Sequence, residues 1–250
     1  MKKYFFAALG IVLIFITALP LSAASLLEKD MAAFDRAYIT SMVLTSQGKR
    51  AASKKAMERT MAQWASFKKT HSDDLIKSNA DKADFIIINQ MLSDAKRIVR
   101  ANGPLNEAYI ILEGVRDVFL NIRKRNSIDY YIDHLTGFHK PMNAIVLAAR
   151  DKTPETLTDS ILSRIKDNFK LAGQSWGNLQ KASFDPELFS FDAKKEAQRQ
   201  ACIKAETEAL NKLKKALNKG DKETIIKAAA GIKPNFDSLF LLFSNLEDGG

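Results

Sequence analysis

Apolar residues recur at steps of three and four along almost the whole of this 250-residue chain. That spacing places them on one face of an α-helix, whereas a half-buried strand would alternate apolar and polar residues. No stretch alternates for long enough to predict a strand. The pattern instead predicts eight helices, at about 26–47, 50–70, 81–102, 104–125, 129–150, 154–181, 193–219 and 222–246, the last one broken near Gly231 and Pro234.

Residues that end or begin helices fall between these segments. Gly48 is expected to end the first helix and Gly220 the seventh, because glycine tolerates the left-handed backbone found there. Thr153, Pro154 and Glu155 have the order of an N-cap, a first-turn proline and an acidic residue facing the helix dipole. These three residues predict that the sixth helix begins at 154.

The segment 104–125 shows clearly which residues should be buried. Its apolar face consists of Leu105, Ala108, Leu112, Val115, Phe119 and Ile122. Its charged residues, expected mainly on the outer face, are Glu107, Arg116, Asp117, Arg123 and Lys124. Helices of this kind must bury the apolar face against neighbours of similar length.

The predicted fold is therefore all-α, an antiparallel helical bundle of about eight helices. Short links between matched helices favour antiparallel neighbours. The division that we expect is a first bundle unit at 25–126 and a second at 127–250. The sequence leaves two arrangements open, two tandem four-helix units or one elongated domain.

The first 24 residues have the features of a secretory signal peptide. Lys2 and Lys3 precede an apolar run at 4–19, and Ser22 and Ala24 are small enough for signal peptidase to cleave before Ser25. The apolar run is short for a permanent membrane span and no stop-transfer pattern follows it. We therefore expect a soluble protein exported to a bacterial periplasm, without a stable membrane anchor after processing.

Charge and cysteine content narrow the possible partners. Only two of the 38 basic residues lie in the signal, so the processed chain with its 29 acidic residues carries +7. Acidic residues are interspersed among the basic ones, and an exported protein is not expected to bind nucleic acid.

Cys202 is the only cysteine and cannot form an internal disulfide. A small buried side chain is its simplest interpretation.

One predicted helix, 129–150, differs from the others by its histidines. It contains His134 and His139, and Met142 shares a face with His139 at the three-residue spacing. His134 lies about 140° around the helix from His139, so the two histidines do not form a chelating pair. Pro141 has no N–H for the carbonyl of Gly137, which predicts a kink and a free carbonyl close to His139.

Two interpretations of this segment follow. Imidazole and thioether suit haem iron or copper, so His139 and Met142 are candidate cofactor or metal ligands, with His134 a secondary metal candidate. In the other interpretation, His139 is hydrogen-bonded to a neighbouring helix, for example to Glu113, and Met142 simply packs in the core.

The architecture resembles that of periplasmic four-helix-bundle proteins of the soluble b-type cytochrome and cytochrome c-prime group. The resemblance rests on a signal peptide, antiparallel helices and a Lys-Pro-x-Phe entry into the last helix at 233–236. It implies a bundle that binds haem. The chain departs from the group in two ways. It has no CxxCH motif, which excludes covalent c-type haem. The b-type members place a histidine on the last helix of the bundle, whereas this chain has none within 104–125 or 232–246.

Signatures of enzymes are mostly absent from the sequence, which leaves open only catalysis by an arrangement of residues without a known motif. It has no Glu-x-x-His for a di-iron bundle, no His-Glu-x-x-His for zinc, no glycine-rich phosphate loop and no Gly-x-Ser-x-Gly elbow. We therefore predict a non-enzymatic bundle that binds a cofactor, metal or small ligand at the Pro141 helix, with haem or copper the sharpest candidates. The alternative is a periplasmic protein-binding or chaperone-like bundle that needs no cofactor.

Overall fold

The computed structural model describes residues 24–246, and this part of the chain folds into helices without a strand. The helices are α1 (Leu26–Ser46), α2 (Arg50–Leu75), α3 (Asn79–Arg100), α4 (Leu105–Arg125), α5 (Tyr131–Ala149), α6 (Asp159–Lys181), α7 (Ala193–Lys219), α8 (Lys222–Ala230) and α9 (Lys233–Leu241). The all-α prediction is confirmed, and the expected break in the last helix separates α8 from α9. The signal-peptide prediction for 1–24 lies, except for its last residue, outside the described residues.

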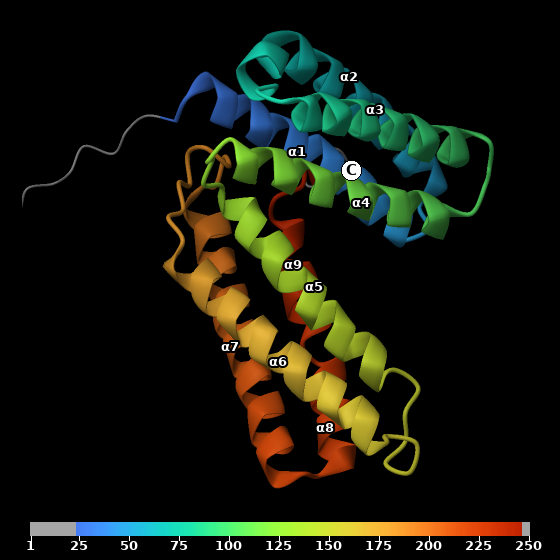
Figure 1. The fold of residues 1–250 in the computed structure, drawn as a ribbon, viewed down its shortest axis with the longest axis vertical. Helices are drawn as coiled ribbons and strands as arrows, with labels where there is room; N and C mark the ends of the chain where they lie inside the picture. Colours follow the sequence, from blue (N-terminus) through green and yellow to red (C-terminus); the bar gives the residue numbers. More distant parts are fainter. Residues whose placement is uncertain (1–23, 247–250) are drawn as a thin grey trace, which may run out of the picture.

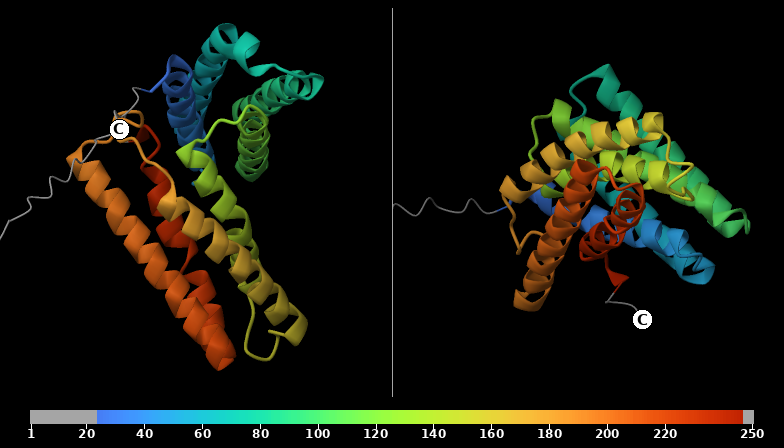
Figure 2. Two further views of the ribbon diagram at one scale, coloured as in Figure 1. Left: turned by 60° about the vertical axis from the view of Figure 1, so that its left-hand side comes forward. Right: turned by 90° about the horizontal axis from the view of Figure 1, so that it is seen from below.

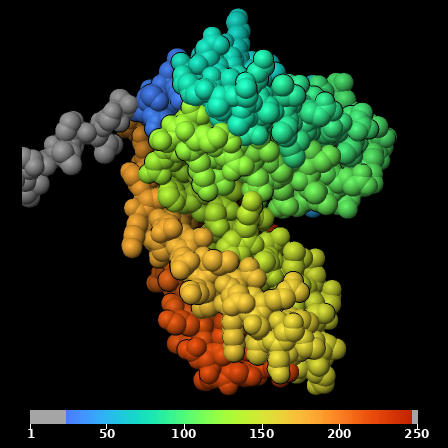
Figure 3. Space-filling model, viewed as in Figure 1, coloured from blue at the N-terminus to red at the C-terminus, as the bar shows by residue number. Residues whose placement is uncertain are grey.

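The helices gather into two groups, visible as separate lobes in Figures 1 and 3. Helices α1 to α4 form one four-helix unit, in which α1 packs on α2 and α4, and α3 packs on α2 and α4. The other unit consists of α5 to α9. In it, α8 and α9 together take the place of a fourth helix beside α5 and α7 (Figure 2). None of the described helices has the combination of length and apolar composition needed to cross a membrane.

Each unit is packed around aromatic residues. In the first unit the ring of Phe34 lies 5.6 Å from Trp64 and 5.5 Å from Phe119 between ring centroids. In the second, Phe138 lies 4.8 Å from Trp176 and 5.8 Å from Phe236. Each buried ring removes a large apolar area from water and so stabilises its unit.

A buried arginine joins the two units. Arg123 of α4 is 1% exposed, and its Nε donates to Asp133 of α5 at 2.8 Å. Its Nη1 lies 3.9 Å from the carboxylate of Asp35 on α1, and its guanidinium lies 4.7 Å from the centre of the Tyr130 ring. Burial raises the pKa of Asp35 to about 6, although the nearby Arg123 opposes that shift. At the C-terminal end, the backbone N–H of Asn245 donates to Thr40 of α1 at 2.9 Å.

Two expectations drawn from helix 104–125 and its neighbours are wrong. Arg116 and Arg123 were expected on an outer face, but both are buried. Arg116 is covered by His139 of α5 and Phe240 of α9, and Arg123 lies against Asp133 of α5. The sixth helix begins at Asp159 and not at 154. Thr153 instead starts a turn, in which its N–H donates to the hydroxyl of Thr156. Leu157 is fully buried directly after this turn, and Thr158 is the N-cap of α6.

Candidate functional site

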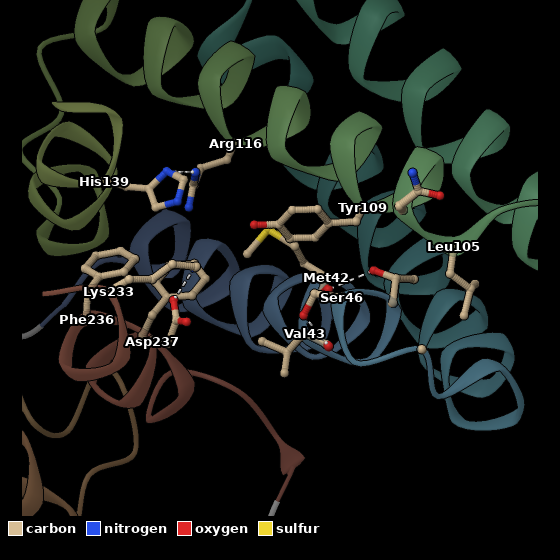
Figure 4. Close-up of a pocket in the computed structure, with 14 residues that line it drawn as sticks. Met42, Val43, Ser46, Leu105, Tyr109, Arg116, His139, Lys233, Phe236 and Asp237 are labelled. Atoms are coloured by element: carbon tan, nitrogen blue, oxygen red, sulfur yellow. Dashed lines mark hydrogen bonds and ion pairs between the residues drawn. The ribbon is translucent and has the colours of Figure 1, made fainter. Parts of the chain in front are cut away.

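A cavity of about 560 Å³ lies where the two units meet. Its walls come from α1 and the turn after it, from α4, from α5 and from α9 (Figure 4). The lining residues are Met42, Val43, Thr45, Ser46, Gly48, Leu105, Asn106, Tyr109, Arg116, His139, Lys233, Phe236, Asp237 and Phe240. Both units are therefore needed to form this site.

His139 reaches the cavity from α5 and is held by Arg116 of α4. Each residue is 5% exposed, and Nη2 of Arg116 lies 2.7 Å from Nδ1 of His139 (Figure 4). Arginine can only donate, so Nδ1 accepts and the neutral ring carries its proton on Nε2. Nε2 lies 3.5 Å from Oε1 of Glu113.

The surroundings keep His139 neutral. Burial, and then the positive charges of Arg116, Lys233 and Lys140, lower its pKa to about 2. A neutral imidazole can act as the acceptor that orients a buried guanidinium. His139 is thus hydrogen-bonded to a neighbouring helix, as one of the two interpretations expected, although its closest partner is Arg116 and not Glu113.

The other predicted site residues lie elsewhere. Met142 is 0% exposed within the hydrophobic core and does not line the cavity. His134 is paired with Asp129 at 3.1 Å and lines a separate surface depression together with Gly137. The helix α5 is continuous through Pro141, and Gly137 is exposed while His139 is buried. The imidazole, the thioether and the Gly137 position are therefore not brought together at one site.

The donor set bears directly on metal binding. Among the described residues no group of three or more histidine, cysteine, aspartate or glutamate side chains could hold a metal ion. Nδ1 of His139 already accepts from Arg116, so a metal bound there would have to displace a charge-assisted hydrogen bond. Haem or copper ligation by His139 and Met142 consequently stays a prediction with no support from this geometry.

Several residues of the cavity carried no signal in the sequence. Lys233 and Asp237 of α9 form an ion pair of 2.8 Å at the edge of the cavity. Tyr109 donates its hydroxyl to Glu113 at 2.7 Å. Their spacing along α9 and α4 is that of ordinary helix-surface pairs. Only the position of α9 beside α4 and α5 places them at one site.

Comparison of the chain with protein-family models, with curated proteins and with solved structures finds no match. The function must therefore be argued from the cavity and its residues.

Proposed function

We propose that this protein is an exported, non-enzymatic binding protein that holds a small organic ligand in the cavity between its two helical units. The main support is the cavity itself, whose 560 Å³ falls in the range of roughly 300–1,000 Å³ common for ligand sites. It also has the mixed wall that such sites use. Apolar side chains supply contact area, and a few buried polar groups supply orientation.

Export is the second part of the proposal and rests on residues 1–24 of the sequence. Ser25, the residue that would follow cleavage, caps α1 in a reciprocal arrangement: its hydroxyl accepts from the N–H of Glu28, whose carboxylate accepts from the N–H of Ser25. Mass spectrometry of the secreted protein should show a mature chain beginning at Ser25. A chain that starts at Met1 and stays with the membrane fraction would contradict the proposal.

Ligand binding is tested by filling the cavity. Ser46 lines the cavity and is exposed enough for a Ser46→Trp side chain to enter it without displacing the core. Gln47, the next residue, is exposed but does not line the cavity, so Gln47→Trp is the matched control. The measurement is a thermal-shift screen of small metabolites on the wild-type protein and both variants.

The expected shift can be stated in advance. A ligand present at 100 times its dissociation constant stabilises the native state by about 2.7 kcal/mol, which raises Tm by about 5–10 °C for a chain of this length. The wild-type protein and Gln47→Trp should show that shift, and Ser46→Trp should not. A shift that is equally large in Ser46→Trp would place the ligand outside the cavity.

Haem or copper is the second candidate, supported only by the position of His139 at the cavity wall. If His139 binds haem iron, haemin added to the purified protein gives the Soret band of a histidine-ligated haem, and His139→Ala abolishes that band. With the ring held by Arg116, we expect no such band. A band lost in His139→Ala would favour the cytochrome-like function.

Binding of another protein is the alternative that needs no cavity. Its candidate contact residues are Ile86 and Ile87 on α3 and, further along the pair of helices, Ile110 on α4, which are 63%, 43% and 61% exposed. The double variant Ile86→Asp and Ile110→Asp would then abolish complex formation, whereas Ser46→Trp would leave it intact.

A further inference from the structure

The buried guanidinium of Arg116 has donors that the protein does not use. Within residues 24–246 its side chain makes one hydrogen bond, from Nη2 to His139, and its Nε is buried without a partner. A buried cation is costly unless it is paired and hydrogen-bonded. Arg116 lines the cavity, so a group bound there is positioned to accept from the Nη1 and Nη2 atoms of the guanidinium, whereas the fully buried Nε faces away from solvent.

The neighbouring carboxylates are already engaged. Glu113 accepts the Tyr109 hydroxyl at 2.7 Å, and its closest oxygen is 3.7 Å from Nη2 of Arg116, beyond hydrogen-bond distance. Asp237 is paired with Lys233 at 2.8 Å. Glu113 therefore forms an ion pair with Arg116 without a hydrogen bond, and neither acid satisfies the hydrogen-bond donors of the guanidinium.

His139 prepares Arg116 to receive an anion. Its neutral Nδ1 accepts a hydrogen bond from Nη2 of Arg116, and the centre of the Phe240 ring lies 5.5 Å from the guanidinium carbon. A guanidinium fixed in this way offers a planar fork of donors that matches a carboxylate. Lys233 at the cavity edge is already paired with Asp237, so Arg116 is the positive charge that an anion in the cavity can bind.

The remaining wall has an apolar part beside the polar side chains of Thr45, Ser46, Asn106 and Tyr109. The apolar part comes from Met42 and Val43 of α1, Leu105 of α4 and Phe236 of α9, which Figure 4 labels, and from Phe240 of α9. An apolar ligand body that packs against these side chains stabilises the complex by about 25 cal/mol for each Å² of apolar surface removed from water. A small inorganic anion would leave this surface uncovered.

We infer that the ligand of the cavity is an organic anion with an apolar body, whose negatively charged head binds Arg116 beside His139. The inference rests on the proposed function and specifies the chemical class of its ligand. The body extends along α1 and α4, where Met42, Val43 and Leu105 line the cavity. Neutral and cationic molecules with the same body bind more weakly, because they leave the guanidinium unsatisfied.

Three probes with one alkyl chain and different heads test this inference: decanoate, decanol and decyltrimethylammonium. Binding is measured by isothermal titration calorimetry at pH 7 on the wild-type protein. Decanoate should bind at least about tenfold more tightly than decanol, since hydrogen bonds to charged groups contribute more than neutral ones. Decyltrimethylammonium should bind most weakly. Equal affinities for decanoate and decanol overturn the inference.

Variants locate the charge that matters. Arg116→Met should reduce decanoate affinity about tenfold and leave decanol affinity unchanged. Arg59→Met removes one exposed positive charge from α2, which does not line the cavity, and should change neither affinity. Because Arg116→Met could disturb folding, the Nε–H NMR signal of Arg116 in wild-type protein is a second readout. It should shift with decanoate and not with decanol.

The outcomes separate the inference from the proposed function. If decanoate and decanol bind equally and Ser46→Trp abolishes both, the cavity binds ligands but does not select anions. If decanoate binds Ser46→Trp as it binds wild type, the site is elsewhere and both ideas fail. If no probe binds, the inference is wrong for this class of ligand, and the metabolite screen alone decides the proposed function.

Discussion

Glu206 of α7 offers the sharpest test of the structure away from the cavity. Its side chain is 0% exposed, and neither carboxylate oxygen has a hydrogen-bond partner within 3.5 Å in the described part of the chain. Burial raises its pKa from 4.5 to about 8, with a smaller contribution from Asp237, while Asn235 opposes the shift. The residue is therefore protonated in the folded protein at neutral pH.

This shift makes stability depend on pH. Between pH 4.5 and 8 the folded state holds a proton on Glu206 that the unfolded state has lost. Stability from this group is therefore complete below pH 4.5 and decreases as pH rises, by about 1.4 kcal/mol for each pH unit. From pH 5 to pH 7.5 the expected loss of unfolding free energy is about 3 kcal/mol.

Glu206→Gln removes the ionisation and keeps nearly the same volume. Urea denaturation of wild type and variant at pH 5, 6, 7 and 7.5 should show the variant gaining on the wild type by about 3 kcal/mol across the range. Any cost of burying the amide is the same at each pH and cancels in the comparison. Glu208→Gln, at an exposed position of the same helix, is the control and should run parallel to wild type. Parallel profiles for Glu206→Gln would refute the burial of an unpaired carboxyl at this position.

Three further predictions concern the junction, the histidine and the backbone. Arg123→Met should lower the unfolding free energy by about 3–5 kcal/mol, because it leaves the carboxylates of Asp35 and Asp133 without the positive charge that pairs with them. Urea denaturation measures this loss. His139 has a pKa of about 2 in the folded state against 6.5 in the unfolded chain, so it stays neutral while the unfolded chain gains a proton. Wild-type stability therefore falls below pH 6.5, and His139→Gln should remove about 2.3 kcal/mol of that loss between pH 6.5 and 4.5 in acid titrations. Gly220→Ala, at φ +72°, should cost about 1 kcal/mol, whereas Gly173→Ala inside α6, with open space around it, should gain about 0.5–1 kcal/mol by thermal melting. A Gly220→Ala variant as stable as wild type would contradict the left-handed helix end.

Helix positions could be predicted from sequence wherever local signals decide them. The predicted helix 193–219 matches α7 at both ends, since Asp192 caps its start and Gly220 takes the left-handed conformation at its end. The start of α6 was missed because the order Thr-Pro-Glu suits a turn as well as an N-cap. The burial of Leu157 selected the turn and delayed the helix to Asp159.

The candidate site was predictable only in part. The sequence predicts His139 as a ligand residue, because it shares a helix face with Met142 close to the Gly137 carbonyl. The structure places His139 at the cavity wall, and its binding of a ligand stays a prediction. The hydrogen-bond partner of His139 was missed, since the periodicity of α4 assigns Arg116 to the solvent side. Arg116 is covered there by His139 of α5 and Phe240 of α9, whose positions depend on contacts between distant parts of the chain. Periodicity shows which face of a helix is apolar, but not which neighbour covers the other face.

The central claim is that the inter-unit cavity binds a small organic ligand, and NMR shift mapping with decanoate tests it most directly. The claim predicts saturable shifts at residues from both units, including Val43, Tyr109 and His139, and their loss in Ser46→Trp but not in Gln47→Trp. Shifts confined to the exposed isoleucines of α3 and α4, or unaffected by Ser46→Trp, would contradict it.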